Sequence, residues 1–166
     1  VPDGFVVTTA AFSAFLTEHE LWERAARLDD IFERHGNGAA LASACREVES
    51  AIRAAAVPET VASAMLAAFD RLAGGRDVRL AVRSSAIGED THASHAGQYH
   101  TELNVERDGL TTAYRAVIAS AYSPAAVSYR FERGITAAEA AMAVGCIRMA
   151  QPRCSGIAFS RRPEAP

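Results

Sequence analysis

The first half of the chain carries hydrophobic residues at helical spacing. Leu41, Cys45, Val48 and Ile52, for example, recur every three to four positions and would line one face of a helix. Thr9 is placed to cap the first helix. The predicted elements are a β-branched strand over 5–8 and helices over 9–18, 21–35, 39–56 and 59–72. This half therefore predicts a helical packet that follows one short strand.

The second half changes to an alternation of apolar and polar residues. Residues 78–85 alternate in this way and predict a strand with one buried face. Ser123 and Pro124 form a strong helix start, since Ser caps well and Pro suits the first helical position. The other expected elements are a polar loop over 86–98, strands over 99–105, 141–150 and 155–160, and helices over 110–121 and 125–133. We expect an α+β fold with a small, mainly antiparallel sheet.

Length and composition predict a single domain of 166 residues. The helical packet would occupy about 9–74 and the sheet part about 77–162. The chain starts at Val1 without a Met, and 163–166 form no terminating element, so we expect a fragment of a larger protein.

Charge, hydropathy and cysteine content indicate which kinds of partner the protein has and in which compartment it works. A net charge of −3 argues against a nucleic-acid-binding surface. No apolar run approaches the ~20 residues of a membrane span. Three cysteines without a CxxC pair predict reduced, mostly buried thiols and a cytoplasmic protein.

The candidate chemistry lies at the end of the strand over 78–85. Arg83 and two hydroxyl residues lead into a loop that contains Gly97. An Arg can bind a polyphosphate through two parallel hydrogen bonds, and a glycine lets backbone amides approach phosphate oxygens. A surface salt bridge is nevertheless the commoner role for an Arg at such a position. All 17 basic residues are Arg, so this chain cannot supply the Lys that many ATP sites place on the phosphates.

Four ordered segments add a family resemblance that covers essentially the whole chain. The most specific is VRSSAIGED, followed by ASHAGQYHTELNV; the others are VPDGFVVTTAAF, AYSPAAVSYRFERGI and AVGCIRMAQPRCSGIAFSRRPE. Together they resemble the nucleotide-binding domain of the phosphoenolpyruvate synthase and pyruvate phosphate dikinase family. The resemblance implies an ATP-grasp N-terminal lobe.

The resemblance also implies roles for individual residues. Arg83 matches the family Arg that contacts the ATP phosphates and is the candidate catalytic residue. The adenine would lie at a hinge over 147–149. The implied ATP-binding residues are Arg83, Ser84, Ala96, Gly97, Gln98, Ile147, Arg148 and Met149. The resemblance implies no metal ligand here: the Mg²⁺ carboxylates belong to the C-terminal lobe and the catalytic Lys precedes Val1.

The reaction that the resemblance implies converts ATP, pyruvate and water to phosphoenolpyruvate, AMP and phosphate. A phosphohistidine on a separate swivelling domain would carry the phosphoryl group. The partners implied are ATP, that domain and the C-terminal ATP-grasp lobe of the same protein. We therefore expect the isolated chain to be inactive.

Three departures from the family pattern keep alternatives open. Ile147 stands where relatives commonly carry Gln, Arg162 where they have Asp, and His95 where they have Phe. A diverged, non-catalytic nucleotide-binding module is one alternative, and a rifampicin phosphotransferase-like enzyme is another. A helical interaction domain would account for the first 75 residues only.

The polar loop also contains several potential metal ligands. These are Glu89, Asp90, His92, His95 and His100. His92 and His95 do not fit the His spacing of zinc sites, so a solvated loop is the simpler interpretation.

Overall fold

The computed structural model describes residues 2–86, 100–137, 139–150, 154 and 156. It confirms an α+β fold: within the described residues, six helices accompany one four-stranded sheet. The helices are α1 Thr9–Glu18, α2 Trp22–His35, α3 Ala39–Ala54, α4 Glu59–Ala73, α5 Leu110–Ala119 and α6 Pro124–Glu132. The strands are β1 Gly4–Val7, β2 Leu80–Ala86, β3 Thr101–Val105 and β4 Met142–Arg148. Two short 3₁₀ turns, η1 Arg107–Gly109 and η2 Ser120–Tyr122, flank α5.

The sheet order is β1-β4-β2-β3, and every neighbouring pair is antiparallel. The first described strand, β1, therefore pairs with the last described strand, β4, which lies in the interior of the sheet. The register between β2 and β3 shifts between Leu80 and Val82, where the ladder is irregular. Asn104 takes a positive φ of 58° close to this irregularity.

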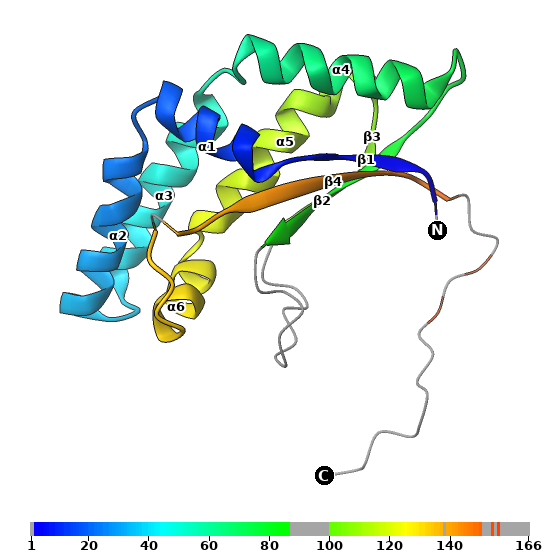
Figure 1. Ribbon diagram of the computed structural model, residues 1–166. Helices are drawn as coiled ribbons and strands as arrows, with labels where there is room; N and C mark the ends of the chain where they lie inside the picture. Colours follow the sequence, from blue (N-terminus) through cyan, green and yellow to red (C-terminus); the bar gives the residue numbers. More distant parts are fainter. Residues whose placement is uncertain (1, 87–99, 138, 151–153, 155, 157–166) are drawn as a thin grey trace.

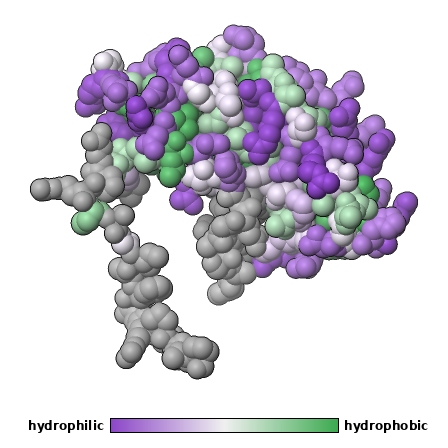
Figure 2. All heavy atoms as spheres, turned by 180° about the vertical axis from the view of Figure 1, so that it is seen from behind, coloured by the Kyte–Doolittle hydropathy of each residue, from purple (hydrophilic) through white to green (hydrophobic). Residues whose placement is uncertain are grey.

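The helices gather on one side of the sheet, with α5 against β2, β3 and β4 (Figure 1). Their apolar stripes form the core, and the predicted stripe of Leu41, Cys45, Val48 and Ile52 is fully or almost fully buried. The opposite faces of the helices carry polar residues. The surface seen from behind is therefore largely hydrophilic, with some apolar residues among the polar ones (Figure 2). The core therefore lies between the helices and one face of the sheet.

Several element boundaries differ from the sequence-based expectations. Thr8 rather than Thr9 is the N-cap of α1, and its side chain makes no capping hydrogen bond. The cap of α6 is confirmed, since Ser123 Oγ accepts from the amide of Ala126 at 3.2 Å. β4 is shorter than the expected 141–150, and of the strand expected over 155–160 only Gly156 lies within the described residues.

The three cysteines are free. Cys45 and Cys146 are buried, as expected for structural thiols, whereas Cys154 is exposed. Burial raises the pKa of Cys45 to about 11 and that of Cys146 to about 12. Both thiols are therefore neutral at physiological pH and contribute to the structure as small apolar groups.

Among the described helices, none is long and apolar enough to cross a membrane by itself. Only α3 and α4 taken together meet the criteria of length and composition, and they are bent by 68° at their break.

Gly4 is required by the contact between β1 and β4. A Cβ added there would lie 2.5 Å from the carbonyl oxygen of Cys146, a backbone atom that cannot move without disturbing β4. We expect Gly4→Ala to lower the free energy of unfolding by about 1–3 kcal/mol, the usual effect of overpacking. Thermal or urea unfolding would measure it. Gly109→Ala is the matched control, because its Cβ would meet Val105 at an ordinary 3.8 Å. Equal stability of the two variants would contradict the prediction.

Candidate functional site

One face of the sheet is left uncovered by the described helices, and one row of paired residues on it spans all four strands. Val6 pairs with Gly145, Gly145 pairs with Arg83, and Arg83 pairs with Thr101. Directly opposed residues in antiparallel strands share a face. The row therefore runs across all four strands, and Arg83 stands near its middle.

The side chain of Arg83 lies over Gly145. Its Cγ is 3.7 Å from the position that a Cβ on Gly145 would take, so the stem packs on bare backbone. Arg83 is exposed, and within the described part of the chain no carboxylate lies within salt-bridge distance of it. The surface salt bridge considered from the sequence is thus not formed with these residues. As far as the described residues are concerned, the guanidinium is free to bind an anion.

A shallow hollow of about 410 Å³ lies beside Arg83 on this face. Its lining combines apolar side chains with strand backbone and one cation. The lining residues are Pro2, Gly4, Phe5, Val6, Arg83, Ser84, Ser85, Gly145 and Ile147. Gly4 and Gly145 leave space in the hollow, because neither residue has a side chain that would fill it.

Ser84 and Ser85 alternate along β2. Ser84 is only 6% exposed and belongs to the helix-covered side, in step with the buried Leu80 and Val82. Ser85 is exposed beside Arg83. Of the two hydroxyl side chains, Ser85 therefore lies on the open face, although the sequence-based assignment named Ser84.

The predicted hinge residues divide between the two sides of the sheet. Ile147 is half-buried, pairs with Gly4 and Ala81, and lines the hollow. Arg148 points the other way, and its Nη2 donates to the carbonyl of Leu72 at 2.6 Å, in the last turn of α4. The structure thus brings Ile147 to Arg83 and directs the Arg148 side chain to a helix end.

The backbone amides of the hinge are already engaged. The amide of Arg148 donates to the carbonyl of Asp3 at 2.9 Å, and that of Met149 donates to the carbonyl of Arg79 at 2.8 Å. A base bound at this position would therefore find carbonyl oxygens and the apolar side chains of Ile147 and Met149. The predicted phosphate-loop residues Ala96, Gly97 and Gln98 lie outside the described residues.

Sequence reasoning missed Val6 and Gly145 as parts of this face. A glycine inside a strand pattern signals a close approach of another group, so Gly145 could have been found. Val6 could not, because its 62% exposure depends on which edge β1 occupies.

The described residues contain no group of three or more His, Cys, Asp or Glu side chains that could hold a metal ion. Of the loop ligands considered above, His100 hydrogen-bonds Glu102 at 2.7 Å on an exposed part of the surface. The remaining four lie outside the described residues.

Comparison with known proteins assigns the family. The model of the pyruvate phosphate dikinase AMP/ATP-binding domain matches residues 1–166. The chain belongs to this family. Similar curated proteins include the phosphoenolpyruvate synthase of Neisseria meningitidis serogroup B, 36% identical over 178 residues and covering 99% of this chain. That of Deinococcus radiodurans is 35% identical over 170 residues and also covers 99% of this chain.

A second group of relatives consists of rifampicin phosphotransferases. A rifampicin phosphotransferase from Streptomyces is 37% identical over 171 residues and covers 98% of this chain. The chain spans only about a fifth of these relatives, namely 22%, 21% and 19% of their lengths. The family thus places an AMP/ATP-binding domain in phosphotransferases of both kinds.

Arg148 offers a test that separates structural support from nucleotide contact. Arg148→Met removes the hydrogen bond to Leu72 and should destabilise the protein by about 1–3 kcal/mol. ATP affinity should stay within about twofold, because the side chain lies on the helix side. Thermal unfolding and calorimetric titration with ATP measure the two effects. A large loss of ATP affinity with unchanged stability would show that Arg148 contacts the nucleotide.

Proposed function

We propose that this chain is the N-terminal lobe of an ATP-grasp domain and holds ATP on the open face of its sheet. The observation that carries the proposal is Arg83, an exposed guanidinium without a partner among the described residues, beside a hollow of about 410 Å³. The membership of the AMP/ATP-binding domain family supports the same ligand.

The residues present fit the parts of a nucleotide. Arg83 would hold the phosphates, because a planar guanidinium donates two parallel hydrogen bonds to phosphate oxygens. Ile147 and Met149 would supply an apolar surface for the adenine. In this proposal, the backbone amides of Gly97 and Gln98 would also donate hydrogen bonds to the phosphate oxygens. Bound ATP supplies the phosphoryl group, and this lobe contributes positioning and charge neutralisation.

The open face also needs a cover. Val6 and Leu103 are large apolar residues exposed at 62% and 58%. Exposed apolar groups around a ligand hollow suit a surface that another part of the protein covers. We assign the cover to the C-terminal lobe of the same polypeptide, which would also bring the Mg²⁺ carboxylates. The catalytic Lys is likewise external, since this chain has none.

For the whole protein, which we place in the cytoplasm, the proposed reaction is that of a phosphoenolpyruvate synthase. ATP, pyruvate and water would give phosphoenolpyruvate, AMP and phosphate through a phosphohistidine on a swivelling domain. The support comes from the phosphoenolpyruvate synthases that match along 99% of this chain.

Arg83→Met in the intact protein tests the ATP site. Loss of a charge-assisted pair of hydrogen bonds should weaken ATP binding about ten- to hundredfold in calorimetric titration. Arg46→Met, on the exposed side of α3, removes the same charge and should leave the affinity unchanged. An unchanged affinity in Arg83→Met would favour the diverged module that does not bind nucleotide there.

The acceptor is tested by assaying AMP formation from ATP in the intact protein. Pyruvate should stimulate it, and rifampicin should not; the reverse would favour the rifampicin phosphotransferase alternative, which the Streptomyces relative motivates. The isolated 166 residues should show no turnover with either acceptor, because the Mg²⁺ ligands and phosphohistidine are supplied elsewhere. Turnover by the isolated chain would contradict the proposal that other parts of the protein supply the Mg²⁺ ligands and the phosphohistidine.

A further inference from the structure

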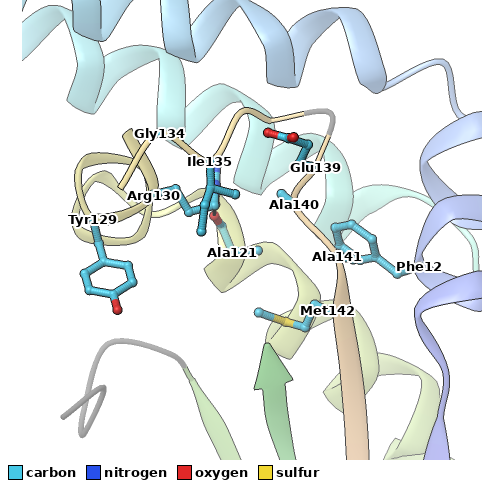
Figure 3. A pocket seen from close by; sticks show the side chains of 10 residues that line it. All are labelled: Phe12, Ala121, Tyr129, Arg130, Gly134, Ile135, Glu139, Ala140, Ala141 and Met142. Atoms are coloured by element: carbon cyan, nitrogen blue, oxygen red, sulfur yellow. Dashed lines mark hydrogen bonds between the residues drawn. The ribbon is translucent and has the colours of Figure 1, made fainter. Parts of the chain in front are cut away.

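The described residues also form hollows away from Arg83. One of about 240 Å³ lies where η2, α6 and the start of β4 meet α1 (Figure 3). Arg130 lines this cavity, but its Nη1 donates to the carbonyl of Ala121, and its guanidinium carbon lies 5.5 Å from the centre of the Tyr122 ring. Because its Nε and Nη2 are buried, Arg130 has no free edge for a ligand in this cavity.

A larger hollow, of about 510 Å³, lies where β1 meets helices α1 and α4, and we call it the β1 groove. The strand contributes three consecutive residues to its lining, and exposed alanines line it on the two helices. These residues are Phe5, Val6 and Val7 on β1, Ala10 and Ala14 on α1, and Ala64 on α4. The β1 groove is therefore largely apolar and has the strand itself as one wall.

The backbone of β1 directs hydrogen-bonding groups away from the rest of the sheet. The amide of Arg148 donates to the carbonyl of Asp3 at 2.9 Å, so these two residues form a hydrogen-bonded pair. Such pairs recur at every second residue of an antiparallel ladder, so Val7 also bonds to β4, whereas the N–H and C=O groups of Val6 face outward. Among the described strands, β1 has no second neighbour. The outward groups of Val6 are thus left for another segment.

The two edge strands of the described sheet differ in how far they discourage such pairing. β3 carries a charged residue, Glu102, and an irregular ladder with β2, and its Asn104 has a positive φ of 58°. β1 has the sequence Gly-Phe-Val-Val, without a charged residue, and its register with β4 is regular. Charges and bulges are the usual means by which an edge strand avoids pairing, and other edges are covered. The edge of β1 therefore has the features of one that is covered.

The groups on this edge indicate what covers it. A helix cannot bond to the outward N–H and C=O groups of Val6, because its own backbone groups are paired internally, whereas an extended segment can. Side chains of an added strand alternate, so every second one would enter the β1 groove. The small side chains of Ala10, Ala14 and Ala64 leave room there for apolar groups.

The length of the relatives indicates where such a segment comes from. This chain spans only 22% and 21% of the phosphoenolpyruvate synthases that it matches, so most of those polypeptides lies outside the matched region. We propose that an extended segment of the same polypeptide, from outside these 166 residues and apolar at every second position, pairs with β1 as a further strand and fills the β1 groove.

Hydrogen-exchange mass spectrometry of the intact protein, resolved to single amides, tests the proposal. The amide of Val6 should exchange within about tenfold of the rate of the Val7 amide, which faces β4, because a hydrogen bond to the added strand would protect it. An amide of Val6 that exchanges faster than this would mean an open edge and would overturn the proposal. The comparison uses the wild-type protein, so it does not depend on the folding of a variant.

Ala64→Trp tests whether the groove holds the added strand. The indole would occupy the groove, so the Val6 amide should exchange at least about tenfold faster than in the wild type, while a slow Val7 amide shows that the sheet is intact. Ala26→Trp, on the exposed side of α2, adds the same bulk elsewhere and should change neither rate. Unchanged exchange of Val6 in Ala64→Trp would count against the proposal. Arg83→Met should also leave Val6 protected, so the groove and the ATP site can fail independently.

A photo-crosslinker identifies the origin of the segment. Thr60→p-benzoylphenylalanine places the crosslinker on an exposed lining residue of the β1 groove in the intact protein. Peptide mapping should find a link to a part of the same polypeptide outside residues 1–166. A link between two copies of the protein, or the absence of any link outside residues 1–166, would overturn the proposal.

Discussion

The pairing of β4 on both of its edges is the constraint on which the rest of this domain depends. β4 pairs with β1 on one side and with β2 on the other, so segments far apart in the sequence meet in one sheet. Met142, Val144 and Cys146 alternate on its helix-covered face, where all three are buried. A slip of one residue would exchange the two faces, so the burial of these side chains fixes the register. The open face, with Gly145 under Arg83, is the consequence.

Arginine serves three different purposes in this domain, and packing decides which. Arg83 is exposed on the open face and has no partner among the described residues. Arg148, the last residue of β4, connects the sheet to the end of α4 by donating a hydrogen bond to the carbonyl of Leu72. Arg130 is buried beside the Tyr122 ring and donates to the carbonyl of Ala121. The same side chain is thus a candidate phosphate ligand, a structural tie and a buried cation held by a carbonyl and an aromatic ring.

Under the proposed function, the open face supplies only part of the nucleotide site. A domain that holds a nucleotide alone would enclose it, whereas this hollow is shallow and edged by exposed apolar residues such as Val6. Sharing a ligand between two lobes lets their relative motion expose or exclude water during phosphoryl transfer. The family relatives, about five times as long as this chain, have room for such further parts.

Local patterns were sufficient to predict most elements of this protein. The apolar spacing of α3, the cap at Ser123 and the alternation around Arg83 all depend on nearby residues, and the structure confirms each of them. The family resemblance rested on contiguous segments in the same way. The side on which each hinge residue lies was not predictable, because it depends on long-range strand pairing. Alternation in the predicted strand already separates Ile147 from Arg148. Only the structure shows which of the two lies on the open face, and it alone buried Arg130 beside a cavity. An arginine has the same local signature on a surface as in a core, and only the packing of distant segments around it determines its partners.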